Sequence, residues 1–478
     1  MLPEIETARP RICQHFLGVR KNCRHAILSV SLSFLAACSG VGPDYAPPTI
    51  ALADSFVEGG SAQKGETTQI QWWTDLNDRK LNDIVTQGLG QNLRVHAALQ
   101  AANAAQANAR AAGVTNQIGG DLSASTYRVD VDADTVGLLP DTFRSATLSA
   151  GSALAGIGRR QEQALASLDA ADFDVGTARL AYLSSVVGAY IDARYYQERL
   201  ELTRQSIANN RRILEIVQRE RDIGQAAELN VAQAKAQLSN VSAQLPTLEA
   251  AFLASVYGIA TLVSEPAGPL LKNMQAGALQ PTPKTSPRIG TPANLLRNRP
   301  DIRATERRYA AAVASIGVAE AKLYPTLALS GTISLDGDSD GSLFGPSLTL
   351  PVFSRGALKA RRDAATATAR QAEILWRASV EQAVQDVQSA QSAYRLSRQK
   401  VTRLREAVSA NRTAFDLTEK AYQDGAIELL DLLKAELTLT QTRGLLAQAV
   451  QQNAANWLRL QIATGSGWAA PREDRDEG

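Results

Sequence analysis

The sequence contains an internal repeat, in which one long segment occurs twice. This repeat constrains the fold more than any other feature of the sequence. A gapless shift of about 200 positions places Asn210-Arg211 on Asn411-Arg412 and Gly224 on Gly425. No proline occurs from residue 141 to 245 or from 352 to 470, so nothing in these stretches forces a helix to end. Each copy is therefore predicted to contain a helix, a β-rich piece, and two very long helices joined at the glycine.

The longest helices carry the spacing of a coiled coil. The stretch Ala181–Ile223 spans about 43 residues, which as a helix would reach on the order of 65 Å. Apolar residues in both copies alternate spacings of three and four, with one asparagine per copy, a placement that can set helix register. The seam residues are Leu200, Ile207, Asn210, Leu214 and Val217 in the first copy and Val401, Leu404, Val408, Asn411 and Phe415 in the second.

Four shorter segments are predicted to be β-strands. They are residues 122–129, 143–154, 326–335 and 343–352, each about ten residues long and bounded by Gly, Pro or Asp. Their length, and the alternation of polar and apolar residues that starts at Thr326, fit transmembrane barrel strands. Four strands cannot close a barrel, and open edges cannot lie in lipid, so other chains must complete the sheet. Three copies would supply twelve strands.

The amino terminus is predicted to be a lipoprotein signal peptide. Basic residues precede an apolar run, Ala26–Phe34, and the tetrapeptide Leu35-Ala36-Ala37-Cys38 follows it. The run is too short for a membrane-spanning helix, which needs about 20 apolar residues. The tetrapeptide resembles a lipobox, so residues 1–37 are expected to be removed and Cys38 to carry N-acyl and S-diacylglycerol chains. The alternative is a signal-peptidase site with an incidental cysteine.

Composition argues against several function classes. The net charge is +2, with Lys and Arg interspersed among Asp and Glu, which gives no reason to expect a nucleic-acid partner. The chain has three cysteines and three histidines, most of them within the predicted signal peptide. A disulfide framework, a zinc site and a Cys/His catalytic pair all need more than the remainder. We therefore expect no enzymatic activity, no metal and no cofactor apart from the lipid on Cys38.

Two loops between the predicted strands are acidic. Residues 336–341 resemble the start of a calcium-binding loop, but the twelfth position is Ser347 rather than glutamate and the flanks are strand-like. We interpret the segment as an exposed loop joining two strands. Its counterpart, residues 130–141, is also acidic. The outer mouth of a pore built from these strands would therefore be negative.

Motifs throughout the mature chain resemble one family. They are Val41-Gly42-Pro43-Asp44-Tyr45, Trp72-Trp73, Arg299-Pro300-Asp301-Ile302, Leu323-Tyr324-Pro325 and Leu350-Pro351-Val352-Phe353. The chain is similar to the TolC-like outer-membrane factors, and particularly to their NodT/OprM-type efflux lipoproteins. The resemblance implies an α+β membrane protein that forms a homotrimer. A twelve-stranded transmembrane β-barrel, with four strands per chain, would continue as a periplasmic coiled-coil barrel of helices.

The resemblance also implies a division of the chain and a set of partners. Residues 38–70 would be a lipidated extended segment, 71–270 and 291–468 the two efflux repeats, 271–290 a linker, and 469–478 a polar tail. The expected location is the cell outer membrane, lipid-anchored and membrane-spanning. The expected partners are outer-membrane lipid, a periplasmic adaptor protein and an inner-membrane transporter of the RND type.

The hairpin tips are the predicted functional site. Gly224 and Gly425 stand where one long helix must reverse into the next, a position that favours a left-handed residue. Acidic residues lie near both tips, and in a trimer each would recur as a ring. These acidic residues are Asp222, Asp424, Glu428 and Asp431. We expect the tips to dock the adaptor and to open like an iris, and the alternative is that the acids only solvate a helix end.

Sequence near the gate departs from the family. Relatives often have Leu-Asp-Ala-Gln where this chain has Leu433-Lys434-Ala435-Glu436. The family's aspartate at this position would form an acidic ring in a trimer, whereas Lys434 would form a basic one. The electrostatics of the family's gate therefore do not apply to this chain.

Three functions remain open at this point. The first is a passive exit duct of a tripartite efflux system, conducting drugs or other small molecules. The second is an exit duct for type I protein secretion, metal ions or a nodulation signal, which residues near the gate do not distinguish from the first. The third is a coiled-coil scaffold without a pore.

Overall fold

The computed structural model describes most of residues 41–469, in two compact units. The predicted signal peptide, Cys38, the acidic loop 130–141 and the predicted tail beyond residue 469 lie outside the described residues. Unit 1 comprises residues 1–47, 106–167 and 308–372, and unit 2 comprises residues 48–105, 168–307 and 373–478. The described residues are 41–58, 68–114, 119–128, 142–151, 157–285, 287–336 and 339–469.

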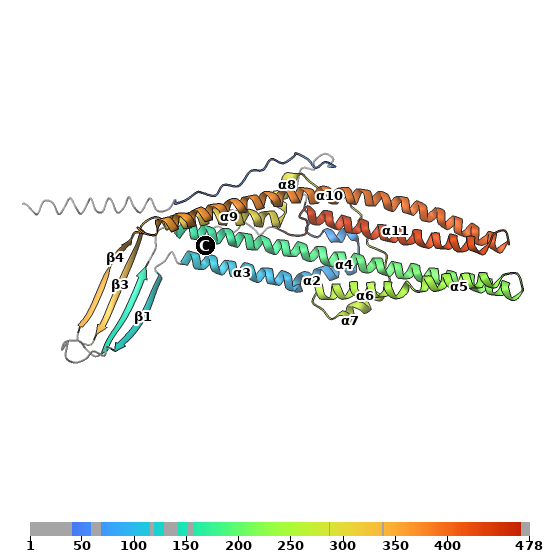
Figure 1. The fold of residues 1–478 in the computed structure, drawn as a ribbon, viewed down its shortest axis with the longest axis horizontal. Helices are drawn as coiled ribbons and strands as arrows, with labels where there is room; N and C mark the ends of the chain where they lie inside the picture. The colour runs from blue at the N-terminus through green and yellow to red at the C-terminus, as the bar shows by residue number, and fades with distance from the viewer. Residues whose placement is uncertain are drawn as a thin grey trace, which may run out of the picture. The chain divides into compact units, whose positions relative to one another are not determined.

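Unit 1 contains a four-stranded antiparallel sheet in the order β1-β2-β3-β4 (Figure 1). In the ladder of β3 and β4, apolar positions oppose apolar positions, as in Leu327 with Leu348 and Leu329 with Pro346. β1 and β4 are the two outer strands of this sheet within one chain. The strands are β1 (Gly119–Arg128), β2 (Thr142–Gly151), β3 (Thr326–Asp336) and β4 (Ser339–Thr349).

The four predicted strands are present, but pairing with a partner shifts their ends. β2 ends at Gly151 rather than at residue 154, because Gly151 pairs with Gly119, the first residue of β1. β4 begins at Ser339 rather than at residue 343, because its ladder with β3 extends to the pair Asp336 and Ser339. The exposed loop predicted at residues 336–341 is therefore corrected, because Asp336 and residues 339–341 belong to the paired strands and residues 337–338 lie outside the described residues. Side-chain patterns alone do not carry this information, since a ladder ends where its partner ends.

The two longest helices exceed their predicted lengths. α4 (Ile157–Asp222) has 66 residues and α10 (Arg355–Gln423) has 69. The prediction placed the first of them at 181–223, because the apolar seam marks only its carboxy-terminal part. The earlier turns are helical as well, since no proline stops them.

The helix that follows the first tip is not one long helix, as predicted, but two shorter ones. It is divided into α5 (Glu228–Ser242) and α6 (Leu245–Leu262), whereas α11 (Leu429–Ala463) after the second tip is unbroken. Pro246 lies in the first turn of α6, where its missing N–H would have no helical partner. The stretch Glu228–Leu262 is long and apolar enough to cross a membrane, by length and composition only.

Shorter helices complete the fold. They are the 3-10 helix η1 (Trp72–Leu76) and the helices α2 (Arg79–Gln91), α3 (Leu93–Val114), α7 (Ala267–Gln275), α8 (Pro292–Asn298) and α9 (Pro300–Ala321).

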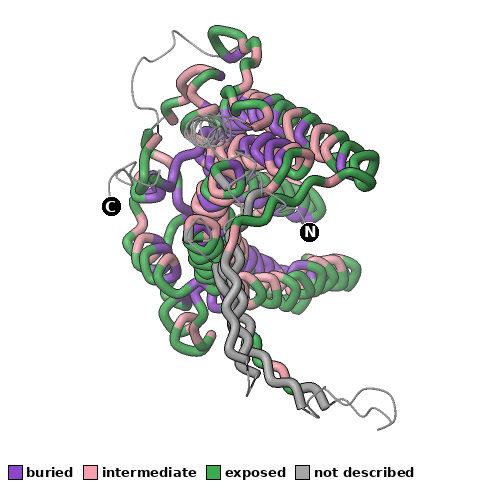
Figure 2. Tube along the Cα trace, turned by 90° about the vertical axis from the view of Figure 1, so that its left-hand side faces the viewer, coloured by how far each residue is buried: buried purple, intermediate pink, exposed green. Residues whose placement is uncertain are grey.

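The core of unit 2 is built around buried aromatic side chains. Trp72 packs edge-on against Trp457 of α11, with ring centroids 5.5 Å apart, and donates from its indole to the Ser466 carbonyl at 3.2 Å. The Trp72-Trp73 pair, whose rings meet edge-on at 5.8 Å and are both buried, therefore serves packing. Figure 2 shows that buried positions along the long helices recur beside exposed ones. This pattern is the expected result of helices that bury one stripe each.

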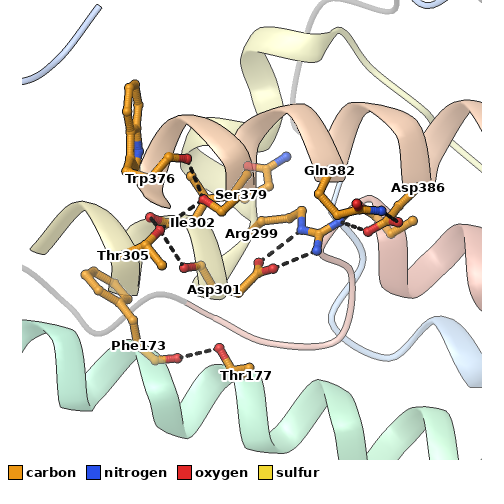
Figure 3. A network of polar contacts seen from close by, with 12 residues as sticks. Phe173, Thr177, Arg299, Asp301, Ile302, Thr305, Trp376, Ser379, Gln382 and Asp386 are labelled. Atoms are coloured by element: carbon orange, nitrogen blue, oxygen red, sulfur yellow. Dashed lines mark hydrogen bonds and ion pairs between the residues drawn. The ribbon is translucent and has the colours of Figure 1, made fainter. Parts of the chain in front are cut away.

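The Arg299-Pro300-Asp301 motif has a structural role in unit 2 (Figure 3). The Arg299 guanidinium bonds both carboxylate oxygens of Asp301 at 2.6 and 3.0 Å, and it reaches Asp386 of α10 at 3.1 Å. It also donates to the Ala463 carbonyl at the end of α11. A planar five-donor fork can satisfy several acceptors at once. Arg299 thus holds the start of α9 to α10 and α11.

In unit 1 the segment that follows Cys38 is fixed to two helices. Arg159 of α4 donates to the Val41 carbonyl at 2.9 Å and to the Asp44 carboxylate at 2.5 Å. Gly42 lies against Gly317 of α9, where a methyl group on either residue would clash with backbone atoms. The lipid attachment predicted at Cys38 would therefore lie a few residues from an anchored segment.

Candidate functional site: the hairpin tips

The two hairpin tips of unit 2 reverse at glycines in the left-handed conformation. Gly224 has φ +77° and Gly425 has φ +70°. The helix ends before them are closed by bonds from Gln225 N–H to the Glu220 carbonyl and from Ala426 N–H to the Ala421 carbonyl. These bonds satisfy carbonyl groups that the helix leaves without a partner. The prediction that a left-handed residue is required at both positions is confirmed.

A small hydrophobic cluster, which we call the tip cluster, packs the two hairpins together. Its buried members come from α4, α5, α10 and α11, so that all four tip helices share one core. The predicted seam passes through this cluster, since Val217 and Phe415 are both buried in it. The tip cluster consists of Ile213, Val217, Val231, Ala234, Phe415, Leu429, Leu432, Leu433 and Leu439.

A polar link joins the hairpins just beyond the tip cluster. The Tyr422 hydroxyl of α10 donates to the Glu220 carboxylate of α4 at 2.6 Å. Burial, and next the hydrogen bond to Glu220, raises the pKa of Tyr422 well above its ordinary value, so that the hydroxyl remains a donor. A weaker ion pair joins Arg212 to Glu419 at 3.8 Å between the same two helices. The link therefore resists separation of the hairpins.

Sequence reasoning missed both partners of this link. It selected exposed acids close to the glycines, whereas Glu220 acts through its contact with another hairpin. The only signal for Tyr422 was a large amphipathic aromatic residue within one turn of Gly425. Such residues often bury the ring and leave the hydroxyl to a polar partner.

The acids predicted from the sequence are exposed at the tips but are not gathered into one cluster. On the first hairpin, Arg221 bonds Asp222 at 2.8 Å and Glu228 at 3.1 Å. These two bonds, first that to Glu228, raise the pKa of the Arg221 guanidinium. Arg221 therefore offsets one of the two negative charges that it contacts at this tip.

The acidic residues of the second hairpin lie at its tip and along the start of α11. Glu428 is the N-cap residue of α11, Asp424 lies beside Gly425, and both are exposed. Asp431 lies 3.8 Å from the ammonium of Lys434, one turn along the helix. Lys434 is exposed, but Glu436 is buried in the packing between helices. Among the described residues no group of three or more His, Cys, Asp or Glu side chains could hold a metal ion.

Comparison with known proteins identifies the family. The family model described as outer membrane efflux protein matches the chain twice, over residues 84–264 and 291–466. The chain belongs to the outer membrane efflux protein family. The matched segments fall within the two repeats predicted at 71–270 and 291–468. The family expected from the sequence motifs is thus confirmed.

Relatives within this family are similar over nearly their whole length. Nodulation protein T of Rhizobium leguminosarum bv. trifolii is 37% identical over 451 residues, which cover 91% of this chain and 96% of the relative. Pyoverdine export outer membrane protein OpmQ of Pseudomonas aeruginosa is 30% identical, covering 93% and 98%. The solved structure of the outer-membrane channel OprN matches 90% of this chain and 99% of its own, with TM-score 0.82 and 27% identity. The predicted outer-membrane efflux channel is confirmed.

Proposed function

We propose that three copies of the chain assemble into one duct, with a twelve-stranded barrel in the outer membrane and a helical tunnel in the periplasm. The observation that carries the proposal is the four-stranded sheet, whose outer strands β1 and β4 have no further partner among the described residues. Unpaired backbone groups are costly in lipid, so both edges must bond to neighbouring copies. Twelve strands lie within the range of known transmembrane barrels.

The long helices also expose apolar side chains that neighbouring copies would cover. Leu417 of α10 and Leu229 of α5 are each 65% exposed. Further exposed apolar residues on α10 and α11 include Leu396 and Leu445. Scattered exposed leucines are ordinary, but their recurrence along helices of this length favours lateral packing into a coiled-coil barrel.

Within this assembly the hairpin tips would form the gate. The link from Tyr422 to Glu220 and the tip cluster hold the two hairpins of each copy together, which corresponds to a closed iris. Opening would then separate the hairpins, and docking of a periplasmic adaptor and an inner-membrane transporter of the RND type would supply the free energy. The exposed acids Asp222, Asp424, Glu428 and Asp431 are the candidate docking and selectivity residues.

A lipid on Cys38 would add a second attachment to the membrane. The clamp of Arg159 on Val41 and Asp44 supports this proposal, since it fixes the chain a few residues after the cysteine. Intact mass spectrometry of wild type and Cys38→Ser tests it directly. Wild type should carry the mass of the acyl chains and begin at residue 38, and an unmodified cysteine would overturn the lipid assignment.

The cargo is proposed to be drugs or other small molecules. Relatives are named for nodulation, for pyoverdine export and, in Pseudomonas putida, for antibiotic and toluene efflux. Most of these names indicate export of small molecules. We therefore favour small-molecule efflux over type I secretion of a polypeptide. Deletion of the gene should sensitise cells to several unrelated amphiphilic compounds.

The decisive experiment measures oligomeric state and conductance together. Native mass spectrometry of the detergent-extracted protein should give a trimer, and planar bilayers containing it should show discrete conductance steps. A stable monomer, or a trimer that conducts nothing even after the tip acids are neutralised, would favour the scaffold over the duct.

A further inference from the structure

A pocket of about 710 Å³ lies within unit 2. We call it the linker pocket, because one wall is the segment between α7 and α8 and the other walls come mainly from α10 and α11. The buried residues that line it include Gln391 and Tyr394 of α10 and Leu460 of α11. Its volume falls within the range of about 300–1,000 Å³ that is typical of ligand-binding sites.

Contacts with η1 hold the linker wall of the pocket in place. The backbone N–H of Lys284 donates to the Asp75 carbonyl at 3.3 Å, and the Thr285 hydroxyl donates to the Asp75 carboxylate. Both Lys284 and Thr285 line the linker pocket. The wall is therefore tied to another element of unit 2, and the Asp75 carboxylate is engaged by Thr285.

The linker pocket is positively charged. Its charged lining residues are four cations, Lys284, Arg395, Arg398 and Arg405, and one acid, Glu58, which leaves an excess of three positive charges. Arg395 pairs with Glu58. Among the described residues no acidic side chain forms an ion pair with the other three cations. The pocket therefore attracts a negatively charged ligand.

Glu58 shows how this pocket holds an acidic residue of a non-helical chain. Arg395 donates to the two carboxylate oxygens of Glu58 at 2.8 and 3.0 Å, and the Ser392 hydroxyl donates to one of them at 2.9 Å. The Gln391 amide donates to the main-chain carbonyl of Glu58 at 2.7 Å. An arginine thus binds the carboxylate through two bonds, which is a strong and directional contact, and a glutamine binds the main chain.

Two further arginines continue the face of α10 that holds Glu58. Arg398 is three residues from Arg395, and Arg405 is seven residues from Arg398, spacings that keep side chains on one face of a helix. Seven residues of helix advance about 10 Å. A peptide in the polyproline II conformation projects side chains i and i+3 to the same side, about 9 Å apart. Two acids with this spacing in a peptide would match the two arginines.

A buried oxygen atom specifies a further property of the ligand. Gln391 is 8% exposed, and its Oε1 has no hydrogen-bond partner among the described residues. An amide oxygen can only accept, and a buried acceptor without a donor is unfavourable. A main-chain N–H supplies such a donor, whereas a simple anion such as sulfate does not. Charge and hydrogen bonding together therefore favour a peptide over an inorganic anion.

We propose that the linker pocket binds an acidic peptide segment of a partner protein, in which two carboxylates pair with Arg398 and Arg405 and a main-chain N–H donates to Gln391 Oε1. The pocket would then be a docking surface in addition to the hairpin tips. A periplasmic location of the partner rests on the proposed duct. Peptide binding itself needs no pore, so a channel that fails to conduct leaves this proposal intact.

Fluorescence anisotropy of the purified full-length protein with a labelled peptide tests the proposal. The probe is the peptide Glu-Pro-Pro-Glu, amidated at its carboxyl end and carrying a dye without net charge at its amino end. Binding should be saturable and should weaken about fivefold in Arg398→Gln and in Arg405→Gln, the effect of losing one exposed ion pair. Arg403→Gln is the matched control, since it removes an exposed arginine of α10 that does not line the pocket, and it should bind as wild type does. Equal affinities of all three variants would overturn the proposal.

Other ligands separate peptide recognition from a general attraction of anions. The peptide Glu-Glu-Pro-Pro has the same charge with adjacent acids and should bind more weakly, as should the probe methylated at its main-chain nitrogens. Sulfate should displace the probe no better than chloride at equal ionic strength. Equal affinity for either altered peptide, or stronger displacement by sulfate, would contradict the assignment. So would a trimer that does not bind the probe, because a neighbouring copy would then occupy the pocket.

Discussion

Replacing Tyr422 with phenylalanine removes the hydroxyl that joins the two hairpins and leaves the ring in place. The 2.6 Å bond to the Glu220 carboxylate is charge-assisted, and such bonds contribute about 1.5–3 kcal/mol. Both residues are only half-buried, so the lower end of the range applies, about 1.5 kcal/mol. That corresponds to roughly a tenfold change in the ratio of closed to open hairpins. If three copies open together, their effects multiply to about a thousandfold.

The open probability of single channels in planar bilayers measures this change. Tyr422→Phe should open far more often than wild type at the same voltage and pH. Glu220→Gln should have a smaller effect, because its amide oxygen still accepts a neutral hydrogen bond. Tyr257→Phe is the matched control, since that tyrosine is on α6 and 48% exposed. The reasoning fails if the open probability of Tyr422→Phe equals that of Tyr257→Phe, or if the double variant with Glu220→Gln shows fully additive effects.

Gly425→Ala should destabilise the second hairpin by about 1–2 kcal/mol, because residue 425 has φ +70°. A methyl group there meets no other atom, so the cost comes from the backbone conformation alone. Gly90→Ala in helix α2 is the control, since its methyl group also meets no other atom, and it should not lower the melting temperature. Arg299→Lys should cost about 1.5–3 kcal/mol of unfolding free energy, measured by thermal unfolding, and Asp386→Asn should cost less because Arg299 keeps its other acceptors. Burial raises the pKa of Tyr190, so its stabilising contribution, full below about pH 10, should be lost as pH rises further. Tyr190→Phe should reduce this alkaline loss, and an unchanged loss in denaturant titrations would contradict the assignment.

Local patterns in the sequence predicted much of the fold. The tip glycines were identified because each copy of the repeat contains two long helices. Gly224 and Gly425 occupy the equivalent position between those helices, where the chain must reverse. The seam asparagines Asn210 and Asn411 were placed correctly in the packing between helices, because spacings of three and four define a face. Family motifs then indicated the family to which the chain belongs.

Contacts between distant parts of the chain could not be predicted in the same way. The partnership of Tyr422 with Glu220 joins residues about 200 positions apart, and nothing in either neighbourhood specifies the other. Arg299 shows the same limit, since its motif was recognised but its contact with Asp386 was not. The ends of β2 and β4 were wrong for the same reason, because strand length depends on the partner.

The sequence by itself determined that this chain has two repeats of long helices, four short strands and glycine tips. Periodicity and backbone conformation are local properties, so neighbouring residues are enough to specify them. Only the tertiary structure decided which polar groups lose water. Glu436 and Lys434 stand two residues apart in one helix, yet one is buried with an oxygen that lacks a partner and the other is exposed. Burial depends on what packs against each face of the helix, and that is decided by residues from the other half of the chain.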